Sequence, residues 1–120
     1  MKTPTFGNTL KKLVLVLAIA LSPVSAYCGT MTGTIASIAY SINTPNFVFI
    51  YLSAPSTGAP ACAATQPNRM TVDLSTQSGK AMYANLLALK LTNPAAVVTL
   101  VGTNACTAWP GTENIRATFL

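Results

Sequence analysis

The stretch from residue 69 to residue 106, "RMTVDLSTQSGKAMYANLLALKLTNPAAVVTLVGTNAC", contains a strand, a helix and a second strand in close succession. Apolar and polar residues alternate over 69–74, and this period of two predicts a half-buried strand. One side of that strand is expected to carry Met70, Val72 and Leu74, and the other side Arg69, Thr71 and Asp73. The valine-rich residues 95–102, "AAVVTLVG", predict the strand that follows the helix.

The helix between these strands is predicted over residues 77–91. Ser75 or Thr76 can cap its first N–H groups, and Asn93 with Pro94 ends it. Its polar residues share no single face, so the helix is apolar almost all round and needs cover on more than one side. One small sheet covers only one side, and we therefore expect the other side to pack against a second copy of the chain. The alternative is an unusually apolar surface helix.

The flanking segments predict three more strands. Residues 30–42, "TMTGTIASIAYSI", are rich in threonine and isoleucine, and Gly33 within them is expected to mark a bulge or bend. A turn at 43–46 leads to a strand at 47–52, and a proline-rich loop at 53–68 follows. The last strand is expected at 114–120, "NIRATFL". The predicted class is α+β, mainly β: a small five-stranded barrel like the oligonucleotide/oligosaccharide-binding (OB) fold, with one helix between strands three and four.

The strand "FVFIYL" at 47–52 is apolar on both faces. One face carries Val48, Ile50 and Leu52, and the other carries Phe47, Phe49 and Tyr51. Because only one face can enter the core, the aromatic face is a candidate ligand-binding surface.

The N-terminus has the layout of a secretory signal peptide. Lysines precede an apolar run at 13–21, and small residues follow, with cleavage expected after Ala26. The run is shorter than the roughly 20 residues of a permanent membrane span, although a membrane-anchored N-terminus is the alternative. We therefore expect a mature single domain at 27–120, secreted or periplasmic, with no membrane association after cleavage.

Charge in this mature segment is sparse. Cleavage leaves Arg69, Lys80, Lys90 and Arg116 against Asp73 and Glu113, a net charge of +2. Nucleic-acid binding needs a cluster of cations on one surface, so we expect no nucleic-acid partner.

Three cysteines, Cys28, Cys62 and Cys106, fall in this segment. Export brings them into an oxidising compartment, where a disulfide is the default. Cys28 lies near the expected mature N-terminus, where chains are least ordered, so Cys62–Cys106 is the preferred pair and Cys28–Cys106 the alternative.

The inventory of catalytic groups is small. The chain has no histidine, and Asp73 and Glu113 are its only acidic residues. Asp73 precedes the helix N-terminus, where a carboxylate has a structural role through the helix dipole. We expect no enzyme activity, no metal and no cofactor.

Residues 69–106 resemble the second half of the B subunits of bacterial toxins that carry one A chain on five B chains. The tail "ACTAWPGTENIRATFL" is similar in layout too, with a cysteine, a tryptophan, a turn and an alternating strand. The chain looks most like subtilase-cytotoxin-like B subunits and related small secreted bacterial proteins. The resemblance implies an OB fold, a Cys62–Cys106 disulfide, glycan binding and a ring in which the helices face a central axis.

Three functions are therefore weighed. The first is a secreted, non-enzymatic binding module for glycans, with Trp109, Phe47, Phe49 and Tyr51 as candidate ligand-binding residues. For Trp109 the alternative is a packing role over the disulfide and the barrel end. The second is a structural or interaction protein that acts through a homo-oligomeric ring, built on helix 77–91, or through an exported catalytic subunit. The third is a small secreted enzyme, against which the missing histidine and the scarce acidic residues argue, or an enzyme inhibitor that uses the proline-rich loop 53–68.

Overall fold

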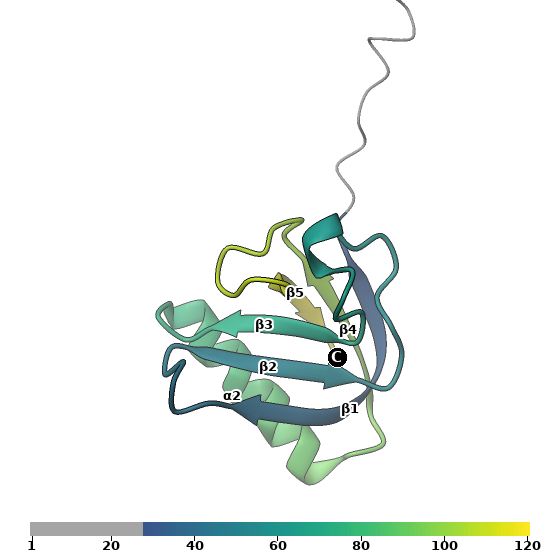
Figure 1. The fold of residues 1–120 in the computed structure, drawn as a ribbon. Helices are drawn as coiled ribbons and strands as arrows, with labels where there is room; N and C mark the ends of the chain where they lie inside the picture. The colour runs from purple at the N-terminus through teal and green to yellow at the C-terminus, as the bar shows by residue number, and fades with distance from the viewer. Residues whose placement is uncertain (1–27) are drawn as a thin grey trace, which may run out of the picture.

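The computed structural model describes residues 28–120, and the expected signal peptide at 1–26 lies outside the described residues. Its strands are β1 (Thr30–Tyr40), β2 (Phe47–Leu52), β3 (Arg69–Asp73), β4 (Val97–Gly102) and β5 (Glu113–Phe119). A short 3-10 turn, η1 (Ala61–Ala63), lies between β2 and β3, and the helix α2 (Gln77–Thr92) lies between β3 and β4 (Figure 1). The prediction of a mainly β chain with five strands and one helix between the third and fourth is confirmed.

The strands pair in the order β1-β2-β3-β5-β4, and β4 returns to β1, which closes the ring. Only the β3–β5 pair is parallel among the pairs in residues 28–120. Every strand therefore has two hydrogen-bonded neighbours, although β3 and β5 pair at only two positions, Met70 with Glu113 and Thr71 with Asn114.

Strand β1 is long because it pairs with two partners in succession. Its first half, from Thr30 to Thr34, pairs with β4, and its second half, from Ile35 to Tyr40, pairs with β2. The register shifts between Ile35 and Ser37. There the ammonium of Lys90 donates to the carbonyl oxygens of Ile35 and Ala36, at 2.6 and 3.0 Å.

The expectation of a bulge at Gly33 is wrong, because Gly33 pairs regularly with Val98. The glycine instead permits a close approach: a Cβ atom at this position would lie 2.6 Å from the hydroxyl oxygen of Ser53. That hydroxyl accepts a hydrogen bond from the amide of Thr34 and joins β1 to the chain beyond β2.

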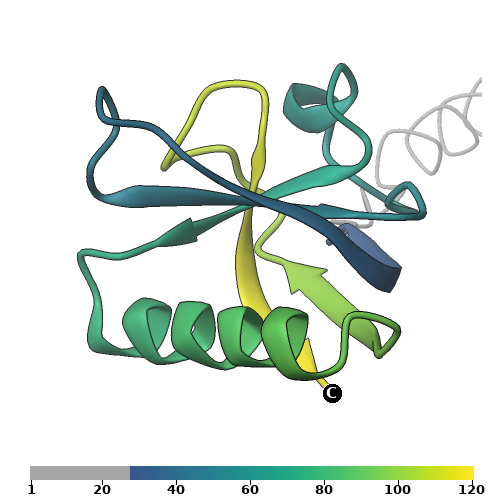
Figure 2. The same cartoon turned by 90° about the horizontal axis from the view of Figure 1, so that it is seen from below.

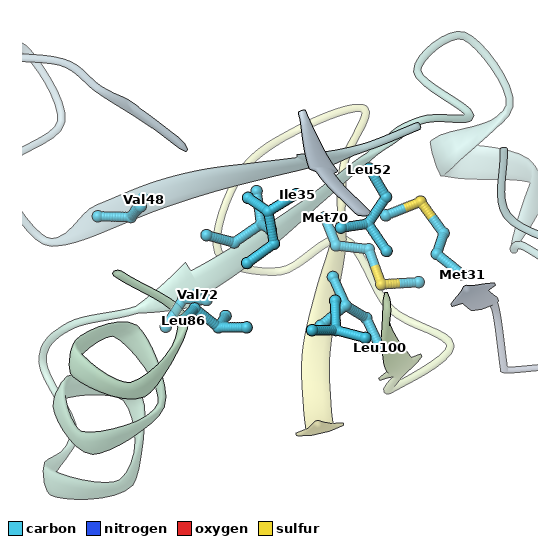
Figure 3. Packing of buried hydrophobic residues seen from close by; sticks show 10 residues of the cluster. Met31, Ile35, Val48, Leu52, Met70, Val72, Leu86 and Leu100 are labelled. Atoms are coloured by element: carbon cyan, nitrogen blue, oxygen red, sulfur yellow. The ribbon is translucent and has the colours of Figure 1, made fainter. Parts of the chain in front are cut away.

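The core fills the interior of the ring. Alternate residues of β2 point inward, and a helix residue, Leu86, closes the interior from one side. Figure 3 shows the labelled side chains converging between the strands and the helix. The cluster of buried residues consists of Met31, Ile35, Val48, Ile50, Leu52, Met70, Val72, Leu86, Val98 and Leu100. The predicted inward residues of β2, and Met70 and Val72 of β3, are thus confirmed, but the prediction that β3 is only half-buried is wrong at Thr71, which is 1% exposed on the opposite face.

The helix begins as expected. The hydroxyl of Thr76 accepts a hydrogen bond from the amide of Gly79 at 3.0 Å, which satisfies one free N–H of the first turn. The helix ends at Thr92, one residue later than predicted. Asn93 is its C-cap residue, and the backbone amide of Asn93 donates to the carbonyl oxygen of Leu89. Figure 2 shows α2 on one side of the strands, with the loops at 53–68 and 103–112 on the opposite side. Within residues 28–120 no helix is long and apolar enough to cross a membrane.

Strand β3 ends at Asp73, one residue before its predicted end, and two other predicted strands are shorter by two residues each. Residues 41 and 42 belong to the β1–β2 turn, in which the amide of Thr44 donates to Ser41. Residues 95 and 96 belong to the turn after the helix, in which the amide of Ala96 donates to Asn93. In both cases the local turn bonds take the backbone groups that strand pairing would need.

Candidate functional site

The disulfide joins the two loops on the side opposite the helix. Cys62 and Cys106 are bonded, with their Cα atoms 6.2 Å apart, and Cys28 is a free thiol. The preferred pairing is confirmed, and the alternative of Cys28 with Cys106 does not form. Cys62 is anchored by η1, and Cys106 lies in the loop between β4 and β5. The loop that carries Trp109 is thereby tied to the loop that precedes β3.

Trp109 packs against Phe49. The two rings meet edge to face, with centroids 5.7 Å apart and planes at 78°, an arrangement that aromatic pairs favour. Phe49 is consequently only 8% exposed although it lies on the outer face of β2. The loop between β4 and β5 therefore covers part of the aromatic face of β2, for which the sequence alone indicated no covering segment.

A tight turn presents the tryptophan. The amide of Thr112 donates to the carbonyl of Trp109, and Pro110 and Gly111 are the two central residues. Gly111 has a φ of 77°, which a side chain would disfavour, and proline followed by glycine suits a turn of this kind. Trp109 and Thr112 thus project from the same four-residue turn.

Arg69 lies on β3, one of the two strands that pair with β2 beside Phe49. Its guanidinium carbon is 4.8 Å from the centre of the Phe49 ring, within the range of a cation–π contact. Its Nε atom donates to the hydroxyl of Thr112 at 2.8 Å. Phe49 therefore touches a residue of β3 and a residue of the β4–β5 loop, and Thr112 connects these two neighbours.

The remaining candidates, Phe47 and Tyr51, lie on the same outer face of β2 as Phe49, two residues to either side. Both are half-buried. In the register, Phe47 is opposite Asp73 and Tyr51 is opposite Arg69. The structure thus brings Trp109 onto Phe49, and strand alternation places Phe47 and Tyr51 beside this pair.

Sequence reasoning missed Arg69 and Thr112 as members of the site. Arg69 was expected on the outer side of its strand, but nothing in the sequence placed it over an aromatic ring. The signal that could have found it is the pairing of β2 with β3, because Tyr51 opposite Arg69 makes Phe49 a diagonal neighbour. For Thr112 the sequence holds no such signal, since its place depends on the path of the loop.

The β4–β5 loop is held by side chains at its base. The amide oxygen of Asn114 accepts from the backbone of Ala108 at 3.1 Å, and its Nδ2 atom donates to the hydroxyl of Thr107 at 2.6 Å. Oε1 of Glu113 accepts from the amides of Asn104 and Gly29. The loop therefore has several anchors besides the disulfide, so the position of Trp109 is prepared in advance of any ligand.

The two carboxylates are both engaged with backbone amides. Glu113 is 1% exposed, and its Oε1 atom lies 3.0 Å from the amide of Gly29 and 2.8 Å from that of Asn104. Oδ1 of Asp73 accepts from the amide of Ser75 at 2.8 Å, just before the helix. Within residues 28–120, no group of three or more histidine, cysteine, aspartate or glutamate side chains could hold a metal ion.

Comparison of the chain with protein-family models, with curated proteins and with solved structures finds no match. The class of protein that the fold and the site define is thus a small, disulfide-bonded, mainly β protein with an aromatic and cationic surface outside β2 and β3.

Proposed function

We propose that the protein is a secreted, non-enzymatic binding module with an OB-like barrel, and that its ligand is a glycan. The observation that carries the proposal is the meeting of Phe49 on β2, Arg69 on β3 and Trp109 on the β4–β5 loop. OB-fold proteins bind oligosaccharides and oligonucleotides on the outer face of strands two and three, bordered by the loop between strands four and five. The order β1-β2-β3-β5-β4, with a helix between β3 and β4, supports the OB likeness.

Charge favours a sugar over a nucleic acid. The surface around Phe49 contains one cation, Arg69, and the expected mature chain has a net charge of only +2. A nucleic-acid site needs several cations along a groove to replace the counterions of the phosphates. An aromatic ring beside a few polar groups is sufficient for a sugar, whose C–H face is apolar and whose hydroxyls need hydrogen-bond partners.

Secretion is part of the same proposal. The signal peptide expected at 1–26 supports it, and the Cys62–Cys106 disulfide is compatible with an oxidising compartment. In this proposal the protein functions as a relative of toxin B subunits, or of the small secreted proteins similar to them.

The test is a glycan array probed with the exported protein and with Trp109→Ala. We expect the wild type to bind a defined subset of glycans and the variant to lose that binding. Phe119→Ala is the matched control, because Phe119 is 62% exposed on β5 and is not one of the candidate ligand-binding residues. Circular dichroism confirms that each variant is folded; unchanged binding by folded Trp109→Ala would remove Trp109 from the site.

A second candidate function is assembly, either of a ring of identical subunits or of a complex with an exported catalytic subunit. The supporting observation is the outer face of α2, where Ala81, Ala84, Ala88 and Leu91 recur at helical spacing and are exposed. Leu91 is 75% exposed, which is unusual for a large apolar side chain on a helix. Native mass spectrometry tests this candidate: we expect an oligomer that Leu91→Lys dissociates, and a strict monomer at micromolar concentration contradicts it.

A further inference from the structure

We infer that removal of the signal peptide creates an internal ion pair, in which the new α-ammonium group of Tyr27 binds Oε2 of Glu113. This inference rests on the export that is part of the proposed function, and it does not depend on the ligand. Its basis is one buried oxygen atom and the chain segments that surround it.

Glu113 is a buried carboxylate with one free oxygen. Its side chain is 1% exposed, and Oε1 accepts from the amides of Gly29 and Asn104. Oε2 has no hydrogen-bond partner within residues 28–120. Burying an ionised carboxylate costs desolvation free energy, and buried charges in proteins are normally paired with an opposite charge. The group that would complete this site is therefore a cationic donor.

The cationic side chains of residues 28–120 do not supply this donor. Arg69 lies over the ring of Phe49, and Lys90 donates to two carbonyls of β1. Lys80 is exposed on α2, and Arg116 is exposed on β5. A cation for Oε2 is therefore expected from the chain just before residue 28.

Oε2 lies beside the start of the described chain. It is the atom that a Cβ atom on Gly29 would meet first, so the missing side chain lets the carboxylate lie against the backbone of residue 29. The nitrogen of Tyr27 is two residues before the amide that binds Oε1, a span of at most about 7 Å. A turn at Cys28 would be sufficient to bring that nitrogen to Oε2, since neighbouring backbone nitrogens can converge on one anion.

Cleavage changes the chemistry of this nitrogen. In the precursor it belongs to the peptide bond between Ala26 and Tyr27, where it is neutral and has one N–H. Hydrolysis consumes one water molecule: Ala26 leaves as a carboxylate, and Tyr27 gains an ammonium group with three N–H donors. A hydrogen bond between two charged groups is stronger than one between neutral groups. Because Glu113 also binds Asn104, the new ion pair would stabilise the start of the β4–β5 loop.

The experiment compares the exported protein with a variant that has Gly-Ser inserted between Ala26 and Tyr27, which moves the ammonium group away from Glu113. Both chains carry Cys28→Ser, because this thiol is the titratable side chain next to Gly29. On β3 the neighbouring ionisable group is Arg69, whose charge is constant in the interval used. Intact mass verifies the first residue of each chain. Urea denaturation between about pH 6 and about pH 10 then measures the folding equilibrium constant, because an α-amino group loses its charge in this interval.

We expect the chain that starts at Tyr27 to have a folding equilibrium constant at least about tenfold above that of the inserted variant near pH 6, and an equal one near pH 10. Pairing raises the pKa of the α-amino group in the folded state. The stabilisation is therefore complete below the pKa of the unfolded chain and is lost as the pH rises through the raised value. In a Glu113→Gln background, the insertion is expected to have no effect at any pH.

Equal folding equilibrium constants for the two chains at every pH would overturn the inference, as would an effect of the insertion that persists in Glu113→Gln. If Glu113→Gln does not fold, reductive methylation with isotope-labelled formaldehyde and NMR compare the pKa of the α-amino group in the folded and the urea-unfolded protein. Equal values there also overturn the inference. A mature chain that begins at a residue other than Tyr27 overturns the inference and leaves export in place, whereas a chain that keeps its N-terminal segment contradicts both.

Discussion

The amide of Gly29 donates a hydrogen bond to Oε1 of Glu113 at 3.0 Å, across 84 positions of the chain. The same oxygen accepts from the amide of Asn104, so one carboxylate connects the start of β1, the end of β4 and the start of β5. The other oxygen, Oε2, is buried without a partner within the described residues. Burying a carboxylate costs free energy of desolvation. The hydrogen bonds from the two backbone amides offset part of that cost and hold the start of the β4–β5 loop in place.

Glu113→Ala tests this connection. The substitution leaves the amides of Gly29 and Asn104 without their shared acceptor, and we expect a loss of about 2–4 kcal/mol in the free energy of unfolding. Urea denaturation followed by circular dichroism measures the loss. Glu113→Gln is the control, because it keeps an oxygen for both amides and is expected to cost less than the alanine variant. Equal stability of the alanine variant and the wild type would show that the carboxylate is dispensable.

Gly102→Ala tests the space around the same carboxylate. A Cβ atom at position 102 would lie 2.0 Å from Oε1 of Glu113, so the side chain or the strand must move. We expect a cost of about 1–3 kcal/mol, which is typical of overpacking a filled interior. The double variant Gly102→Ala with Glu113→Ala removes the obstacle, so the glycine substitution should cost less in that background. If the costs of the two single substitutions simply add in the double variant, the cost of Gly102→Ala does not come from a clash with Glu113.

The disulfide is expected to contribute strongly to stability. Cys62 and Cys106 are separated by 44 positions, and closing a loop of this length stabilises a protein by about 4 kcal/mol in the chain-entropy model. We expect the double variant Cys62→Ser, Cys106→Ser to lose about 2–4 kcal/mol in the free energy of unfolding, measured with urea under non-reducing conditions. Cys28→Ser is the control and should unfold like the wild type, since Cys28 is a free thiol. A comparable loss in the control would point to a different pairing in solution.

Lys90 is predicted to stabilise the register shift of β1. Its ammonium donates to the carbonyls of Ile35 and Ala36, where the regular pairing of β1 with β2 is interrupted. Lys90→Met keeps most of the aliphatic chain and removes the donor, and we expect a loss of about 1–3 kcal/mol. Thermal unfolding measures it, with Lys80→Met as the matched control because Lys80 is exposed on the same helix. Equal midpoint temperatures of thermal unfolding for the two methionine variants would contradict this role of Lys90.

Much of the fold could be predicted because its signals are local. The inward positions of Met70 and Val72 and the cap at Thr76 depend on neighbouring residues alone, and both appear in the structure. The strand "FVFIYL" shows where such signals run out. Both of its faces are apolar, so the face that does not enter the core was a candidate ligand-binding surface. The sequence could not show that Trp109 covers Phe49 on that face.

The errors also have physical reasons. Gly33 was expected to mark a bulge or bend, yet the register shift lies between Ile35 and Ser37, where Lys90 of the helix donates to the strand. Glu113 is an ordinary charged residue in a sequence, but here it is one of the most buried side chains of the described chain. Both outcomes depend on contacts between segments tens of residues apart.

The sequence by itself determined the elements, their order, the inward faces of β2 and β3 and the preferred cysteine pair, because these follow from periodicity, turn residues and spacing. Only the tertiary structure decided that Arg69, Thr112 and Trp109 meet around Phe49. That meeting depends on the β2–β3 register and on the path of a loop held by Cys106, Glu113 and Asn114, and no local pattern specifies the position of a loop relative to a distant strand.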